Sequence, residues 1–173
     1  TRKFAALLPT LPIAVQAELI SALTDRGDKT ARPAIVALLS SSDDEAVRVA
    51  AIRSLVFLGQ ASDLQLLLTC LTSDSQAEAG EARRTLGRLP GDSLSQALAA
   101  ELDKPDPATR KSLLEILVDR RAFLVASDLL PLAVEQDPVV RSAAMSALSQ
   151  LGGADQRSEE RRVGTGGGGG GGG

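Results

Sequence analysis

Arginine and aspartate side chains that recur at one spacing are the residues of this 173-residue chain best suited to chemistry. Each of three aspartates lies four residues before an arginine, and the pairs share a register of 31 residues. A guanidinium can bind an anionic ligand, but its fixed fork also suits carboxylates and carbonyls between packed helices. We favour the second interpretation, a structural ladder that is interrupted at Ala79 and comprises Arg48, Arg110, Arg141, Asp44, Asp106 and Asp137.

Residues for enzymatic chemistry are missing from the sequence. The chain has no histidine to act as a base, and Cys70, its only cysteine, can form neither an internal disulfide nor a paired metal site. No glycine-rich loop joins a strand to a helix, and no serine stands in a nucleophile elbow. The acidic pair Asp43 and Asp44 is explained by helix capping. We therefore expect a protein that is not an enzyme and has no catalytic, cofactor-binding or metal-binding residues.

The composition argues against nucleic-acid binding and against a membrane-spanning segment. The formal charge is −3 and aromatic residues make up 2% of the chain, so the basic excess and the stacking platforms of nucleic-acid-binding proteins are both absent. No apolar stretch approaches the roughly 20 residues of a membrane span. We expect no nucleic-acid partner and no membrane span. The apolar residues are mainly Leu, Ala, Val and Ile, which favours closely packed helices over sheets, with Cys70 as one more small core side chain.

A repeat of 31 residues organises the apolar positions. Leucines stand at this spacing in four copies, and small or apolar residues follow the same spacing four residues earlier. Within one copy, apolar residues recur at helical intervals and form a single stripe from Val47 to Leu58. The two repeated sets are Leu55, Leu86, Leu117 and Leu148, and Ala51, Ala82, Leu113 and Ala144.

Each apolar stripe begins just after a residue that can cap a helix. Such side chains accept a hydrogen bond from the unpaired amides of the first helical turn. Ser75 with Glu78 also predicts a capping box. Proline follows two of the capping residues, at a position where its missing N–H costs nothing. The predicted helix starts are Asp44, Ser75, Asp106 and Asp137.

A shorter helix is expected before each of these second helices. Their predicted ranges are 32–41, 62–71, 92–102 and roughly 127–135. Pro131 should kink or shorten the last of them. Glycines are expected to end helices in the left-handed conformation, namely Gly27, Gly59 and Gly152.

Paired helices of this kind cannot bury a core alone and must stack on their neighbours. The sequence therefore predicts an all-α fold, an α-solenoid of stacked antiparallel helical hairpins. About four and a half repeats occupy residues 1–152, with the array truncated at its N-terminus. Residues 153–173 break the pattern and end in pure glycine, so we expect a disordered tail there. Residues 1–156 alone should expose apolar end faces and associate.

Two segments carry a resemblance to a known family. Residues 46–59 (AVRVAAIRSLVFLG) and 139–152 (VVRSAAMSALSQLG), each after an acidic turn, resemble the bacterial HEAT-like repeat of the phycobilisome-lyase type. This resemblance covers about residues 11–152 and implies that the ladder arginines bond to turns of adjacent repeats. The stretch DRGDKTARPAIVALL also resembles HEAT segments of large multidomain proteins of planctomycete-like bacteria. The tail from Arg157 resembles a translated sequencing adapter followed by poly-glycine.

The exposed face of the second helices is the candidate partner-binding surface, because an α-solenoid repeats that face regularly. Its charges are of both signs, so no single class of ligand is indicated, and an ordinary solvated helix face explains the same pattern. Val56 with Phe57 is a candidate apolar contact patch. The candidate partner-binding residues are Arg53, Phe57, Arg84, Arg88, Glu115 and Asp119.

Three functions are compatible with these features. We expect a protein–protein interaction scaffold, part of a larger protein, that binds another protein or an adjacent domain of the parent chain. The alternative is an accessory repeat module of a multidomain enzyme that is lyase-like, cytochrome-like or carbohydrate-active. A purely structural spacer is the third interpretation, and in that case no surface residue outside the core should matter.

Overall fold

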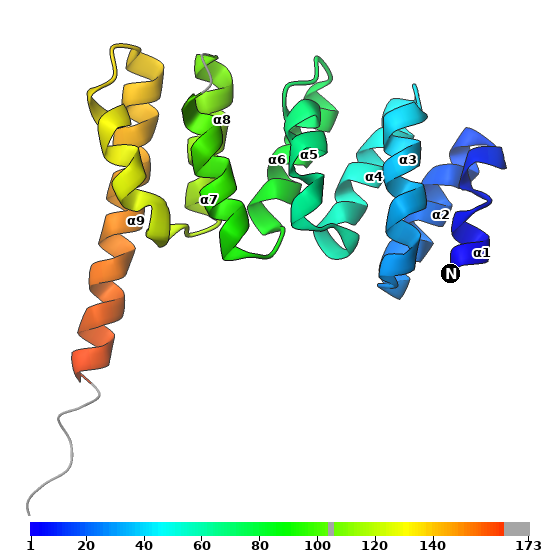
Figure 1. Cartoon of the computed structure of the whole chain (residues 1–173), viewed down its shortest axis with the longest axis horizontal. Coiled ribbons are helices and arrows are strands. Elements are labelled where there is room, and N and C mark those ends of the chain that lie inside the picture. The colour runs from blue at the N-terminus through cyan, green and yellow to red at the C-terminus, as the bar shows by residue number, and fades with distance from the viewer. Residues whose placement is uncertain (104–105, 165–173) are drawn as a thin grey trace, which may run out of the picture. The chain divides into compact units, whose positions relative to one another are not determined.

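The computed structural model describes residues 1–103 and 106–164, without the side chains of residue 92 and of residues 153–164 (Figure 1). The described residues form helices and turns and contain no strand. The prediction of an all-α fold is confirmed. The chain divides into two compact units, Thr1–Leu94 (unit 1) and Ser95–Gly173 (unit 2).

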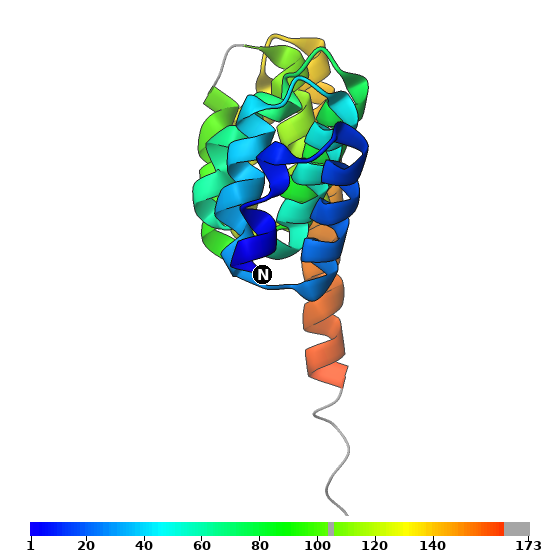
Figure 2. The same cartoon turned by 90° about the vertical axis from the view of Figure 1, so that its right-hand side faces the viewer.

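Unit 1 is a series of short and long helices in alternation (Figure 1). Helix α4 packs on its hairpin partner α3 and also on α2 and α6, so consecutive hairpins stack through their second helices. Figure 2 turns the side of unit 1 that carries α1 and α2 toward the reader. The elements are α1 (Arg2–Ala5), η1 (Leu8–Thr10), α2 (Ile13–Arg26), η2 (Lys29–Ala31), α3 (Arg32–Ser41), α4 (Glu45–Leu58), η3 (Ala61–Asp63), α5 (Leu64–Leu71) and α6 (Gln76–Arg88).

Unit 2 continues the same order of elements. Helix α9 packs on both α8 and η5, as the second helix of a hairpin should. No helix in the described part of the chain is long and apolar enough to cross a membrane. The elements are α7 (Asp92–Ala100), which begins at the boundary between the units, then η4 (Glu101–Asp103), α8 (Pro107–Asp119), η5 (Phe123–Val134) and α9 (Pro138–Gly164).

The second helices begin where the capping residues predict. The Asp44 carboxylate accepts a hydrogen bond from the Val47 amide at 3.0 Å, and the Asp106 carboxylate accepts one from the Thr109 amide at 2.8 Å. Ser75 and Asp137 cap α6 and α9 in the same way. The apolar register is buried as well, because the set Ala51, Ala82, Leu113 and Ala144 is fully excluded from solvent.

The capping box predicted at the start of α6 forms only in part. The Ser75 hydroxyl accepts from the Glu78 amide at 3.2 Å, but the Ser75 amide donates to the Ser73 hydroxyl. The Glu78 carboxylate binds Arg48 instead, because a charged donor outcompetes a neutral amide for a carboxylate.

The predicted helix near 127–135 is wrong in type. Residues Phe123–Val134 form a 3-10 helix that contains Pro131. Proline lacks the N–H that an α-helix needs at that position and clashes with the preceding turn. The tail predicted at 153–173 lies partly in the final turns of α9 and otherwise outside the described residues, so its disorder stays a prediction.

One of the three predicted glycine caps adopts the left-handed conformation. Gly27 ends α2 with φ of 67°, whereas Gly59 ends α4 with φ of −68°. A side chain at Gly59 would meet the Leu55 carbonyl oxygen at 2.3 Å, so close packing explains this glycine. Gly152 does not end a helix, because α9 continues past it. In unit 2 the residue that turns left-handed after α8 is Arg121, with φ of 53°.

Candidate functional site

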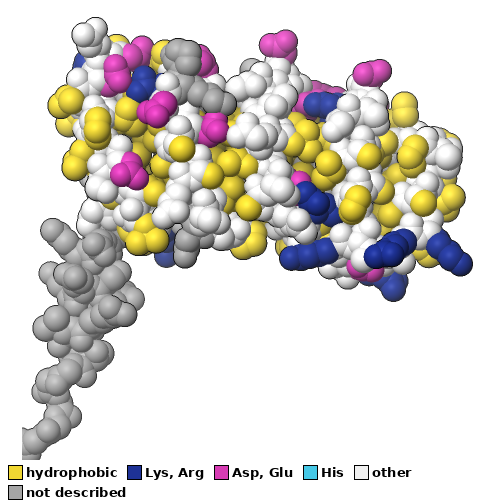
Figure 3. Space-filling view, viewed as in Figure 1, with side chains coloured by type: hydrophobic (Ala, Val, Ile, Leu, Met, Phe, Trp, Pro, Cys, Tyr) yellow, Lys and Arg dark blue, Asp and Glu magenta, His cyan; other side chains and the backbone are white. Residues whose placement is uncertain are grey.

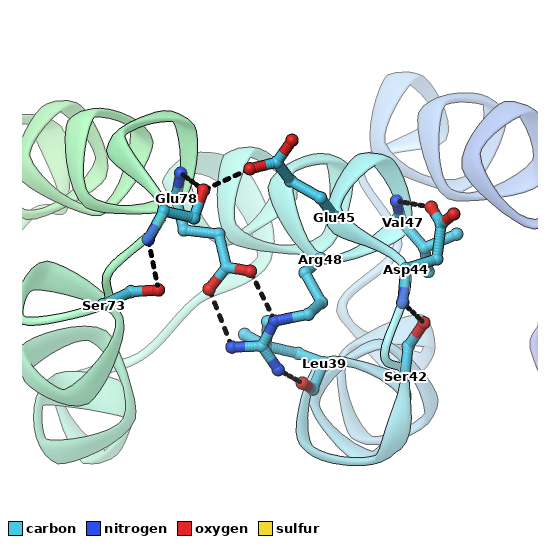
Figure 4. A network of polar contacts seen from close by, with 9 residues as sticks. Leu39, Ser42, Asp44, Glu45, Val47, Arg48, Ser73 and Glu78 are labelled. Carbon is cyan, nitrogen blue, oxygen red and sulfur yellow. Dashed lines mark hydrogen bonds and ion pairs between the residues drawn. The ribbon is translucent and has the colours of Figure 1, made fainter.

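Arg48 joins its own hairpin to the following one (Figure 4). Its Nε and Nη2 donate to the two carboxylate oxygens of Glu78 on α6 at 2.7 and 2.8 Å. Its Nη1 donates to the carbonyl of Leu39, near the end of α3, at 2.7 Å. One guanidinium therefore connects both helices of one hairpin to the second helix of the next.

The Arg48–Glu78 pair is electrostatically favourable in spite of its burial. The bond to the Glu78 carboxylate raises the pKa of Arg48, and burial opposes that shift. The same bond lowers the pKa of Glu78 below its ordinary value. Glu78 is 5% exposed, so Arg48 supplies the compensation that a desolvated carboxylate requires.

The other two ladder arginines find different partners in unit 2. Arg110 on α8 donates from Nη2 to the Glu135 carboxylate at 3.0 Å, and this bond lowers the pKa of Glu135. Arg141 on α9 donates from Nη1 to the carbonyls of Glu135 and Gln136, at 2.7 and 3.1 Å. Both arginines thus fasten second helices to the turn that precedes α9.

A further inter-repeat pair was not identified from the sequence. Arg32 at the start of α3 binds the buried Asp63 carboxylate with Nε and Nη2, the Nε bond being 2.8 Å, and this pairing raises the pKa of Arg32. The two residues stand 31 positions apart. The repeat spacing itself was therefore the available signal, because it places equivalent turns of consecutive hairpins side by side.

Within unit 1 the structure brings together two of the candidate partner-binding residues. Arg84 on α6 donates from Nη1 to the Glu81 carboxylate at 2.6 Å, and Arg53 on α4 reaches the same oxygen at 3.4 Å. Glu81 is almost fully buried, whereas the side chains of Arg53 and Arg84 are 64% and 61% exposed. Two exposed guanidiniums from consecutive hairpins are therefore held by one buried anion.

Two more candidate residues lie one turn further along the same helices. Phe57 follows Arg53 by one turn on α4 and is exposed over 65% of its surface, and Arg88 follows Arg84 by one turn on α6 and is also exposed. Val56, predicted to be exposed beside Phe57, is half-buried. Figure 3 shows that Lys and Arg side chains gather along one edge of unit 1 on the face drawn there.

The remaining candidates, Glu115 and Asp119, lie on α8 in unit 2. Asp119 is exposed and Glu115 is half-buried. They carry charge opposite to that of the arginines of unit 1. Because these two residues belong to unit 2, we define the candidate site by the α4–α6 residues of unit 1 alone: Arg53, Phe57, Glu81, Arg84 and Arg88.

The described residues contain no group of three or more metal-ligating side chains that could hold an ion. Cys70 is buried in α5 as expected, and burial raises the pKa of its thiol. A buried thiol with a raised pKa is a poor nucleophile. We therefore place Cys70 in the core.

Comparison with known proteins identifies the repeat. The family model for HEAT repeats matches residues 2–87. A chain in the complex of CpcE and CpcF of phycocyanin lyase from Nostoc sp. PCC7120 is similar in fold, with 21% identity and a TM-score of 0.57 over 87% of this chain. This chain spans 65% of the length of that lyase chain. An engineered protein is similar over 88% of this chain and 79% of its own length, with 20% identity and a TM-score of 0.49.

No curated protein sequence matches the chain. The family match and the fold agree with the resemblance seen in the sequence and with the arrangement of stacked helical hairpins. The chain is a HEAT-repeat protein, an all-α array of helical hairpins in which residues 2–87 match the family model.

Proposed function

We propose that the chain is a non-enzymatic binding module that recognises an acidic segment of another protein through the α4–α6 site. The observation that carries this proposal is the buried Glu81 carboxylate, which holds the exposed guanidiniums of Arg53 and Arg84 from consecutive hairpins. The shared carboxylate restrains both arginine side chains on the exposed face of the second helices. Side chains fixed before binding lose less conformational entropy when a ligand arrives.

The charge balance of the site supports an acidic ligand. Glu81 neutralises one of the two positive charges that it binds, and Arg88 adds another on the same helix as Arg84. The site therefore keeps a positive excess. Arginine presents five N–H donors, so Arg53 and Arg84 retain donors for carboxylates of a ligand after binding Glu81. Charge-assisted hydrogen bonds of this type are the strong ones in protein recognition.

Phe57 provides the apolar part of the same site. Most of the surface of the Phe57 ring is exposed, and covering it with a partner removes apolar surface from water, which favours binding. Aromatic and arginine side chains together are typical of the residues that dominate interface energies. The ligand that fits best is therefore an extended or helical segment with Asp or Glu next to a large apolar side chain.

A second candidate function starts from the similarity in fold. The similar chain from Nostoc belongs to a complex of two phycocyanin lyase proteins, so this chain could instead serve as an accessory repeat module of a lyase-like enzyme. The identity of 21% supports the fold alone. In this second function the same α4–α6 site would contact the enzyme partner.

The test is a peptide selection on the purified full chain. A random peptide library would be selected for binding, and the strongest peptides would be synthesised and their affinities measured by fluorescence polarisation. We expect enrichment of Asp and Glu beside Phe, Leu or Trp. The double variant Arg53→Gln and Arg84→Gln should weaken binding at least ~10-fold, because charged hydrogen bonds contribute roughly 1.5–3 kcal/mol each.

Arg26→Gln is the matched control, since Arg26 is an exposed arginine of unit 1 at the end of α2, outside the site. It should leave the affinity unchanged. Selected peptides without acidic residues would argue against the proposal, as would equal affinities for the double variant and the control.

A further inference from the structure

The second helices of unit 1 carry three different kinds of side chain at one equivalent position. The thirteenth residue of the helix is Asp25 in α2, Phe57 in α4 and Arg88 in α6. Asp25 and Arg88 are exposed, and Phe57 is 65% exposed. We call Asp25, Phe57 and Arg88 the outer row. It presents an acid, an aromatic ring and a base in that order.

The three residues of the outer row lie on neighbouring helices. Helix α4 packs on both α2 and α6, and the three helices run in the same direction with a shorter helix between each pair (Figure 1). Early positions of α4 meet early positions of α6, since Arg48 binds Glu78. Later positions meet later ones, since the Ile52 carbonyl accepts a hydrogen bond from the Thr85 hydroxyl at 3.1 Å. Equal positions of consecutive second helices therefore lie side by side.

The exposure of the outer row does not depend on how many hairpins flank it. Phe57 has a second helix on either side, α2 and α6, and is still mostly exposed. Arg26, the next residue after Asp25, takes the register position of the buried Leu58 and so lies on another side of the helix. Neither Asp25 nor Arg88 forms an ion pair within the part of the chain that the structure describes. Both charges are therefore accessible to a ligand.

The spacing of packed helices sets the spacing of ligand side chains that can reach the outer row. The axes of packed helices are roughly 8–10 Å apart. A polyproline II segment has three residues per turn and rises about 3.1 Å per residue, so every third side chain points the same way and lies about 9 Å from the last. In a β-strand the third side chain points to the opposite face, and an α-helix advances only about 4.5 Å in three residues. The polyproline II spacing matches the row.

We propose that the ligand of this surface is a polyproline II segment that crosses α2, α4 and α6, with a basic, an apolar and an acidic side chain at every third position. The basic side chain pairs with Asp25, the apolar one covers Phe57, and the acidic one binds Arg88. This inference rests on the proposed function, because its acidic end binds the α4–α6 site. It adds a basic residue on the other side of the apolar one, which the α4–α6 site alone does not require.

The experiment is fluorescence polarisation with labelled, acetylated heptapeptides and the purified full chain. The first peptide has Lys, Phe and Glu at positions one, four and seven and proline elsewhere, because proline favours the polyproline II conformation. The second peptide has Glu in place of Lys. The wild type should bind the first peptide about 5-fold more tightly, because Asp25 attracts the Lys and repels the Glu.

Substitutions of Asp25 test the contact with the basic residue. Asp25→Lys should reverse the preference, so that the second peptide binds more tightly, and Asp25→Asn should remove the preference. Asp74→Lys is the matched control, because it makes the same change of charge at an exposed residue of the turn before α6, at the other end of that helix from Arg88. It should keep the wild-type preference.

A third peptide tests the spacing. It has Lys at position two and proline at position one, so its Lys points away from the side that carries Phe and Glu. We expect it to bind about 3-fold more weakly than the first peptide, because the pair with Asp25 is lost.

Three results would overturn the inference. Equal affinities of the wild type for the first two peptides, or an unchanged preference in Asp25→Lys, would show that Asp25 does not contact the ligand. Equal affinities for the first and third peptides would show that the spacing is wrong. If Arg53→Gln with Arg84→Gln still weakened binding, the proposed function would stand without the inference. If that double variant bound every peptide as tightly as the wild type, both would fail. Circular dichroism checks the folding of each variant.

Discussion

Replacement of Arg48 by methionine is the most severe test of the hydrogen bonds by which Arg48 joins two consecutive hairpins. Methionine keeps an unbranched apolar stem but removes three hydrogen bonds, two to Glu78 and one to the Leu39 carbonyl. The Glu78 carboxylate, whose side chain is 6% exposed, would then lack its charged partner. Breaking a buried pair in this way typically costs roughly 3–5 kcal/mol. Because the Arg48 side chain is 25% exposed, we expect a loss near the low end, about 3 kcal/mol.

The assay is urea unfolding at pH 7, followed by circular dichroism, with a double-mutant cycle. Arg48→Met, Glu78→Met and the double variant give the coupling energy of the pair, which should be at least about 1.5 kcal/mol. Arg26→Met is the control, because Arg26 is an exposed arginine at the end of α2 and its loss should cost at most about 1 kcal/mol. A loss below about 0.5 kcal/mol for Arg48→Met, or additive single losses, would refute the reasoning.

Three further predictions concern the same core. The Arg48 bond lowers the pKa of Glu78, so the charged pair stabilises the fold fully above the unfolded pKa of about 4.3, and this stabilisation is lost as the pH falls through the lower folded pKa. The loss of unfolding free energy caused by Glu78→Gln, measured by urea unfolding, should therefore shrink as the pH falls toward the folded pKa. Ile52→Ala should cost roughly 2–5 kcal/mol, whereas Met145→Ala, at the same register position but exposed, should cost less than about 0.5 kcal/mol in dilute protein. Cys70 should react with a thiol reagent only as fast as the protein opens, because the thiol is 2% exposed.

These predictions have clear contrary results. If the loss of unfolding free energy caused by Glu78→Gln grew toward acid pH, Arg48 would not be stabilising the charged carboxylate. Equal losses for Ile52→Ala and Met145→Ala would contradict the difference in burial. Rapid stoichiometric labelling of Cys70 in native buffer would place the thiol at the surface.

The sequence predicted helix starts best where a capping side chain and the 31-residue repeat indicate the same position. The apolar spacing and the capping side chains at Asp44, Ser75, Asp106 and Asp137 point to the same four helix starts, and all four are present. The 3-10 helix around Pro131 was harder to predict, because a proline that shortens an α-helix does not specify what replaces it.

The candidate site could be predicted only in part. The exposure of Arg53 and Arg84 can be predicted from their positions on the second helices, but their shared contact with the Glu81 carboxylate cannot. Glu81 is a charged residue that the fold buries, and burial of a carboxylate depends on donors from another hairpin rather than on local sequence. Glu78 illustrates the same difficulty, since its local role as a capping-box partner was replaced by the bond to Arg48.

The most direct test of the proposed function is a map of where a ligand contacts the protein. Isotope-labelled full chain would be titrated with a selected acidic peptide, and the shifts of backbone amide signals would be followed by NMR. The account predicts that the largest shifts lie between Arg53 and Phe57 on α4 and between Arg84 and Arg88 on α6. Largest shifts around Val15 or Met145, or none on α4 and α6, would contradict it.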